Sequence, residues 1–195
     1  MKNLNILIAL AVHLILASCG EPAATEPAKT DYTHTGDSVI NATFDALRNA
    51  LTAAMRDKGA AGAVAFCNEK AYAITSTYAS GNIIINRVAE KYRNPQNAPD
   101  SADALQWQRF ASAKANGEPL QPALVEEKNI VHYYKPILLQ PACAACHGVK
   151  NKDILPLVLS TIDSLYPHDR ATGFAPGDLR GMWKVSFVRN AGRIP

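Results

Sequence analysis

The hydrophobic and polar positions of the chain first form a helical pattern over residues 37–58. Phe44, Leu47 and Leu51 recur at steps of three and four residues, which places them on one side of a helix. Asp37 is suited to cap the first turn. We therefore expect an amphipathic helix over this range, with its apolar side against a core.

A second helical pattern begins after the glycine-rich stretch at 59–62, which interrupts the first helix. Val64, Cys67 and Ala71 share one face of this second helix, and polar residues occupy the other face. The pattern thus puts a cysteine on an apolar helix face.

Shorter strand and helix patterns fill the rest of the chain. Trp183, Val185 and Phe187 alternate with polar residues, as in a strand of a sheet with one covered face. Pro136 is expected to break a strand or to lie at a sheet edge. Because the order of elements has no strict strand–helix–strand rhythm, the sequence predicts an α+β fold with an antiparallel sheet and flanking helices. The other expected elements are strands at 83–85, 124–125 and 130–134 and helices over 101–115 and 154–166.

The N-terminus is typical of a bacterial export signal. A charged start is followed by an apolar run over residues 4–16, shorter than the roughly 20 residues that span a bilayer. The run ends in Leu-Ala-Ser-Cys, which resembles the lipobox before the lipidated cysteine of bacterial lipoproteins. We expect a signal peptide over 1–18 and a lipid anchor on Cys19, at the periplasmic face of a membrane. Gly20 slightly favours the outer membrane, and an ordinary signal peptide is the alternative.

Residues 19–36 are rich in Glu, Pro, Ala, Thr and Lys and have no apolar periodicity, so they are expected to form a flexible tether. The remaining residues, 37–195, have the length of one domain. The formal net charge is +3 and no block of Lys and Arg occurs, which gives no case for nucleic-acid binding.

The motif Cys-Ala-Ala-Cys-His at 143–147 is the main chemical signal of the chain. Two thiols at this spacing can add to the two vinyl groups of one porphyrin, and the adjacent imidazole then binds the iron. We expect one haem c, attached covalently by Cys143 and Cys146, with His147 as an axial ligand. The alternatives are a thioredoxin-type pair, a short-loop disulfide, and a zinc site that also uses His168.

The second axial position of the iron has several candidates. Cys67 has no obvious disulfide partner once the other three cysteines are assigned, so it is either an inert buried residue or an iron ligand. His34 lies in the expected tether and is a poor candidate. The other candidates are Met55, Met182, His132 and His168.

Five segments together resemble a known family, and they are Arg87–Pro99, Lys135–Ile137, Cys143–Gly148, Tyr166–Phe174 and Gly177–Gly181. The family is that of the PAS-like c-type haem domains, which occur alone or as extracytoplasmic sensor domains of histidine kinases and chemoreceptors. The resemblance covers most of residues 38–190. It implies a PAS-like fold around the haem, with His147 and Cys67 as the two iron ligands. The chain departs from the family at two places. Ala89 stands where a hydroxyl is expected, and Gln-Trp-Gln at 106–108 stands where an acidic residue is common.

The expected ligands also limit the function. With imidazole and thiolate both bound, the iron has no vacant position, and the anionic sulfur favours ferric iron and a low reduction potential. We expect electron transfer with an unidentified redox partner, and no enzymatic activity. The alternative is a redox or gas sensor, in which Cys67 leaves on reduction and a diatomic ligand enters. Arg87, Arg93 and Arg180 are either partners of the haem propionates or solvated surface residues.

Overall fold

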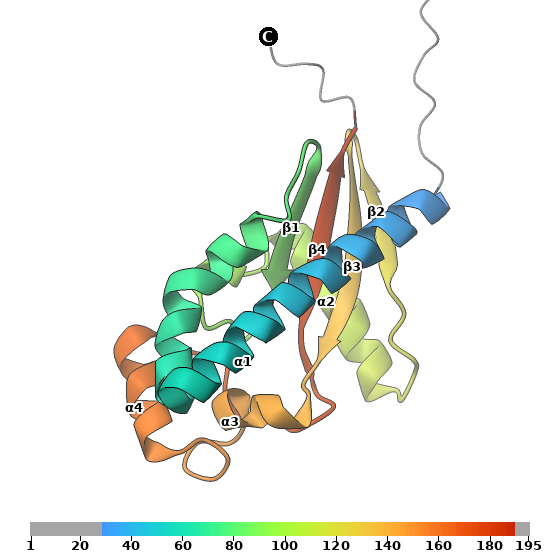
Figure 1. The fold of residues 1–195 in the computed structure, drawn as a ribbon. Coiled ribbons are helices and arrows are strands. Elements are labelled where there is room, and N and C mark those ends of the chain that lie inside the picture. The colour runs from blue at the N-terminus through green and yellow to red at the C-terminus, as the bar shows by residue number, and fades with distance from the viewer. Residues whose placement is uncertain (1–28, 190–195) are drawn as a thin grey trace, which may run out of the picture.

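The computed structural model describes residues 29–189, in which four antiparallel strands form one sheet in the order β1-β4-β3-β2 (Figure 1). Helices flank this sheet, so the expected α+β fold is confirmed, and it agrees with a PAS-like architecture. The strands are β1 (Ile83–Val88), β2 (Ala123–Glu127), β3 (Ile130–Leu138) and β4 (Leu179–Val188).

Four α-helices and two short 3-10 turns complete the described chain. The helices are α1 (Lys29–Ser76), α2 (Ser101–Ala115), α3 (Ala144–His147) and α4 (Pro156–Leu165), and the 3-10 turns are Pro95–Asn97 and Pro141–Cys143. Pro156 lies in the first turn of α4, where its missing N–H costs no hydrogen bond. Within the described residues, none of the helices combines the length and apolarity needed to cross a bilayer.

Helix α1 begins earlier than the sequence pattern indicates. It starts at Lys29, and Tyr32 is already buried against the sheet. Asp37 is inside the helix and is not its cap: its carboxylate accepts hydrogen bonds from Tyr133 Oη at 2.9 Å and Lys135 Nζ at 2.6 Å. The predicted tether is therefore wrong over 29–36, which belong to the folded helix. The predicted signal peptide and Cys19 lie outside the described residues.

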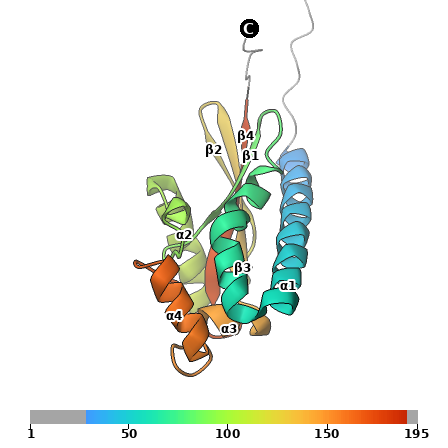
Figure 2. The same ribbon diagram turned by 60° about the vertical axis from the view of Figure 1, so that its left-hand side comes forward.

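A sharp kink at Gly59 divides α1 into two halves. Gly59 has φ 67° and ψ −178°, a backbone conformation open almost only to glycine. Figures 1 and 2 show that the C-terminal half (60–76) turns back from the kink towards the end of the sheet where the N-terminal half (29–58) begins. The predicted interruption at 59–62 is thus confirmed as a change of direction.

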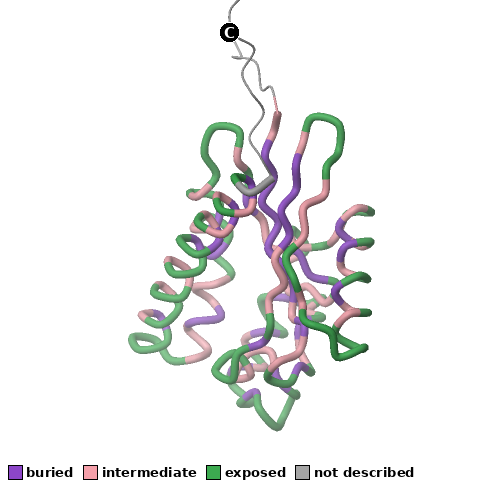
Figure 3. The backbone as a smooth tube through the Cα atoms, turned by 90° about the vertical axis from the view of Figure 1, so that its right-hand side faces the viewer, coloured by how far each residue is buried: buried purple, intermediate pink, exposed green. Residues whose placement is uncertain are grey.

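The two faces of the sheet are covered by different helices. The N-terminal half of α1 packs on one face, over a core that includes Ile85, Tyr133 and Val185. Helix α2 covers the other face through Phe110, which packs with Met182. Because β4 is an inner strand with helices on both sides, nearly all of it is buried, and the prediction of a single covered face is wrong (Figure 3).

The polar face of β4 is buried because α2 supplies charged partners to it. Lys184 Nζ lies 2.8 Å from a carboxylate oxygen of Asp103 and 3.0 Å from one of Asp100. Tyr134 Oη donates a hydrogen bond to Asp103 at 2.8 Å. Asp100 also caps α2, in a reciprocal capping box with Asp103. Sequence periodicity cannot reveal such a buried ionic network, since the same alternation fits a solvated face.

Strand β3 continues through Pro136 to Leu138. The pairing of β2 with β3 ends at Tyr134, so Pro136 has a partner strand, β4, on one side only, as a residue at a sheet edge has. The expectation of a sheet edge at this proline is confirmed, although the strand itself does not stop there. The irregularity at 137–138 then directs the chain towards the motif at 143–147.

Candidate functional site: the Cys-Ala-Ala-Cys-His motif and its surroundings

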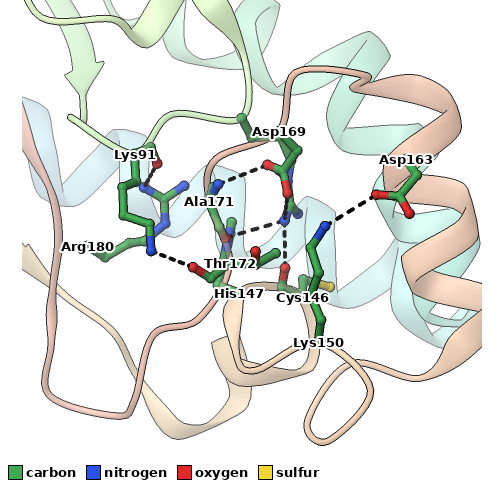
Figure 4. A network of polar contacts seen from close by, with 10 residues as sticks. Lys91, Cys146, His147, Lys150, Asp163, Asp169, Ala171, Thr172 and Arg180 are labelled. Atoms are coloured by element: carbon green, nitrogen blue, oxygen red, sulfur yellow. Dashed lines mark hydrogen bonds and ion pairs between the residues drawn. The ribbon is translucent and has the colours of Figure 1, made fainter.

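The motif lies at the end of the sheet that is opposite to the start of α1 (Figure 1). Four segments that are distant in sequence meet there: the C-terminal half of α1, the connection 89–94 after β1, the motif with α3, and the segment 166–174. Polar contacts join the last three of these segments (Figure 4).

The motif forms one turn of helix. The 3-10 turn Pro141–Cys143 leads directly into α3, so that Cys143 and Cys146 are three residues apart on a helical path. Cys143 is exposed and Cys146 is half-buried, and neither forms a disulfide. Two thiols three residues apart on one helical turn can both reach the vinyl groups at the edge of one porphyrin. This geometry fits the attachment chemistry predicted from the spacing.

His147 has a fixed ring orientation. Its Nδ1 lies 2.7 Å from the carbonyl oxygen of Ala171, so Nδ1 carries the proton and donates it. Burial, together with the nearby cations Arg180 and Arg93, holds the pKa of His147 well below its usual value. The ring is therefore neutral with a lone pair on Nε2, the form in which histidine binds a metal.

Cys67 lies beside the motif. Val64, one turn earlier on the same helix, packs in one cluster with Cys146 and Tyr166. Asn68, the residue after Cys67, makes a side-chain hydrogen bond to Tyr166. Burial raises the pKa of the Cys67 thiol, and the charges of Arg87 and Arg93 oppose this rise. Cys67 is thus a half-buried thiol with two guanidinium groups and the motif as its neighbours.

Each of the other candidate axial ligands is either buried in the sheet core or exposed on the surface. Met182 is fully buried on the α2 side of the sheet, and His132 makes a 2.8 Å contact with Ser186 Oγ. Met55 is exposed on the N-terminal half of α1, and His168 and His34 are exposed too. In the part of the chain that the structure describes, no group of three or more His, Cys, Asp and Glu side chains is placed to hold a metal ion.

Arg93 clamps the motif to the segment 166–174. Its Nε lies 2.9 Å from Asp169 Oδ1, and its Nη2 donates to the carbonyl oxygen of Cys146 at 2.7 Å. The two side chains are only 12% and 2% exposed, so this is a buried ion pair. Asp169 Oδ1 also accepts the backbone N–H of Ala171, whose carbonyl orients His147 (Figure 4). The side chain of Arg93 therefore binds other groups of the protein, and its role is to hold the motif against the segment 166–174.

Arg87 and Arg180 differ from Arg93 because each keeps a free donor. The Nε atoms of both are buried, and they have no hydrogen-bond partner among the described residues. Arg180 donates through Nη1 to the carbonyl oxygen of Lys91 at 3.2 Å and lies 5.2 Å from the ring centre of Phe174. Burial and the charges of Arg93 and Arg87 lower the pKa of Arg180 to about 10. These orphaned donors fit a ligand that brings carboxylates.

The site has an excess of positive charge. Arg87, Lys91, Arg93 and Arg180 lie around the motif, and Asp169 is the carboxylate that pairs with one of them. Sequence reasoning identified the three arginines and missed Lys91 and Asp169. Both belong to the segments that carry the family resemblance, but their partners are about 80 residues away and periodicity gives no sign of them.

The fold and the site together define a class: a PAS-like α+β domain that carries a Cys-Ala-Ala-Cys-His motif at one end of its sheet. The family model described as Tll0287-like matches residues 26–187, which is most of the chain, and the protein belongs to this family. The resemblance noted in its segments is thereby confirmed. The crystal structure of the cyanobacterial heme-protein Tll0287 is similar, with a TM-score of 0.58 and 26% identity over 85% of this chain and 99% of that chain. No curated protein matches the chain.

Proposed function

We propose that the protein is a mono-haem c-type cytochrome that transfers electrons on the outer side of a bacterial membrane. In this proposal Cys143 and Cys146 form the two thioether bonds, and His147 and Cys67 are the axial iron ligands. The observation that carries it is the convergence of Cys67, from a different helix, on the Cys-Ala-Ala-Cys-His motif. The haem of the cyanobacterial relative supports the same cofactor here.

The residues around the motif suit this cofactor. Arg87 and Arg180 offer buried N–H donors to the two propionates, which would also offset the local excess of positive charge. Ala171 fixes the ring of His147 so that Nε2 is free for the iron. The bound haem would supply a one-electron ferric–ferrous couple, and the chain would set its potential through the two ligands and the nearby cations.

A filled coordination sphere favours electron transfer over catalysis. Thiolate and imidazole leave no position on the iron for a substrate, and the charge of the thiolate stabilises the ferric state. We therefore propose a low reduction potential and no enzymatic role. In this proposal the haem is attached after export from the cytoplasm, which agrees with the export signal and with a lipid anchor on Cys19.

A second candidate function is redox or gas sensing. It is favoured by the kink at Gly59, since Cys67 belongs to the half of α1 that this residue separates from the sheet-bound half. If that half moves when the iron is reduced, Cys67 leaves the iron and a diatomic ligand can bind. Carbon monoxide added to the reduced protein distinguishes the two: rapid binding with loss of thiolate features favours a sensor, and inertness favours a carrier.

The proposed ligation is tested by the variant C67S, with M182L as the matched control for the methionine alternative. Loss of the anionic sulfur should change the ferric visible and EPR spectra and raise the reduction potential. The control should keep the parent spectra. If C67S and the parent protein had the same spectra, Cys67 would not be an iron ligand. Haem that leaves the protein in acid–acetone would contradict the covalent attachment.

A further inference from the structure

The carbonyl oxygen of Ala171 is close to two donors at the site. The ring of His147 donates to it through Nδ1 at 2.7 Å, and Nη2 of Arg93 lies 3.5 Å from it (Figure 4). Ala171 is fully buried, so bulk solvent does not reach this oxygen. The strength with which Ala171 accepts the proton of His147 therefore depends on the protein groups around it.

Backbone hydrogen bonds hold this oxygen next to His147. The N–H of Phe174 donates to the carbonyl oxygen of His147 at 3.0 Å, and the N–H of Gly173 donates to the carbonyl oxygen of Gly148 at 2.7 Å. The two stretches of chain are thus paired directly beside the contact between the His147 ring and Ala171. Because this pairing fixes the position of the oxygen, the charge next to it is what can change its strength as an acceptor.

The guanidinium group of Arg93 lies among three acceptors. Its Nη2 is 2.7 Å from the carbonyl oxygen of Cys146, 3.3 Å from Asp169 Oδ2 and 3.5 Å from the carbonyl oxygen of Ala171. Its Nε also binds Asp169 Oδ1, at 2.9 Å. Since Nη2 carries two hydrogens, Asp169 and Cys146 compete with Ala171 for them. Asp169 therefore limits how strongly Arg93 binds Ala171.

We infer that Arg93 and Asp169 are positioning residues that set the reduction potential of the proposed haem iron through the carbonyl oxygen of Ala171. This inference rests on the proposed function, in which His147 is an iron ligand. An oxygen that accepts from His147 alone draws the Nδ1 proton more strongly and makes the ring a more basic ligand, which favours ferric iron. The cation of Arg93 beside the same oxygen weakens this effect. The pair thus keeps the potential higher than an unshared Ala171 carbonyl would give.

The first test is R93K in the haem-loaded protein, measured by redox titration and ferric EPR. The variant keeps the positive charge, but the ammonium nitrogen ends one bond short of Nη2, so it can pair with Asp169 and lies farther from Ala171. We expect the redox equilibrium to shift severalfold towards the ferric form, with altered EPR g values. The matched control is R48K, because Arg48 forms an exposed ion pair with Asp45, and it should keep the parent potential and spectrum.

The second test is the double variant R93M/D169N, which separates this mechanism from a simple effect of charge. It removes one positive and one negative charge, so the net charge near the iron stays the same. Asn can still accept the N–H of Ala171 through Oδ1. With Arg93 gone, Ala171 accepts from His147 alone, and the potential should fall as it does in R93K. A potential equal to that of the parent would overturn the inference.

The outcomes distinguish this inference from the proposed function. If the double variant does not fold, R93K still decides, because it retains a partner for Asp169. Lower stability of R93K in urea together with the parent potential is the result of a structural role alone, and it would overturn this inference while the proposed function stands. A parent protein without covalent haem, or with spectra that exclude a histidine ligand, would overturn the proposed function and this inference with it.

Discussion

At the scale of single residues, the site separates arginines that hold the protein together from arginines that keep a donor for a ligand. Arg93 has its hydrogen bonds satisfied by Asp169 and by the carbonyl oxygen of Cys146. Arg180 retains a buried Nε without a protein partner. Loss of the Arg93–Asp169 pair is therefore expected to lower the stability of the fold. Loss of Arg180 is expected to change the reduction potential of the proposed haem iron.

Replacement of Arg180 by Met should lower the reduction potential. The lost cation lies near His147, and without it the ferric state is less disfavoured. We expect a fall on the order of 60 mV, which is about a tenfold change in the redox equilibrium of a one-electron couple. Redox titration measures it, and R180K, which keeps the charge, should lie close to the parent value. An unchanged reduction potential in R180M would show that the charge of Arg180 does not influence the haem iron.

Replacement of Asp169 by Ala should destabilise the fold. It leaves the buried charge of Arg93 unpaired and removes the acceptor for the N–H of Ala171. Breaking a buried pair in this way costs about 3–5 kcal/mol of unfolding free energy. Urea denaturation measures it. The matched control is D45A, which breaks the exposed pair with Arg48 and should cost less than about 1 kcal/mol. Equal losses in both variants would show that the Arg93–Asp169 pair has no special role.

At the scale of the elements, local signals predicted α2 well and predicted the start of α1 badly. Helix α2 begins at Ser101 because Asp100 and Asp103 cap it through neighbouring backbone groups, which is information carried by the local sequence. The first two turns of α1 form because Tyr32 packs on Phe187 of β4. That contact joins residues more than 150 positions apart, and no local pattern predicts it.

The same distinction applies to the site. The motif cysteines and His147 can be proposed from the sequence alone, because the chemistry of haem attachment requires them to be close together in the chain. Cys67 was proposed by counting cysteines and by family resemblance, because its position near the motif depends on the packing of α1 against α3 and α4, which no local pattern predicts. The clamp formed by Arg93 and Asp169 was not predicted, because it joins two loops that contain no periodic signal.

Replacement of Gly59 by Ala should disturb the helix that carries Cys67. An alanine at φ 67° and ψ −178° costs about 1–3 kcal/mol, and the chain can relieve that cost by straightening α1. We expect lower stability together with altered thiolate features in the ferric spectrum. Gly117, at φ 71° beyond the end of α2, is the matched control. G117A should lose stability and keep the parent spectrum; a normal spectrum in G59A would mean that the kink does not position Cys67.

His132, which contacts Ser186 between β3 and β4, should make the unfolding free energy fall in mild acid. Burial and the charge of Lys184 lower the pKa of His132 below 6.5, although Glu127, Asp103 and Asp100 oppose this shift. The unfolded chain takes up the proton first, so stability is lost as the pH falls from about 6.5 through the lower pKa of the folded state. H132Q should show a smaller loss in urea midpoint between pH 7.5 and pH 5. A loss equal to that of the parent would exclude His132 as the cause.

At the scale of the whole molecule, the sheet joins two ends with different roles. The β2–β3 turn and the start of α1 lie at one end, and the motif, α3 and the segment 166–174 lie at the other (Figures 1 and 2). Core residues from both faces of β4 connect the ends without interruption. The stability of the domain therefore depends on the sheet core. The candidate site lies past the end of the sheet, on short helices and loops.

The position of Lys29 has a consequence for how far the protein reaches. The N-terminal half of α1 extends about 45 Å from its first residue to the kink near the motif. If a lipid on Cys19 holds the protein at a membrane, the first turn of α1 is the part of the described fold nearest to the anchor in sequence, and the motif lies at the other end of this helical half. A redox partner would then meet the motif at the end of the domain opposite to the anchored one.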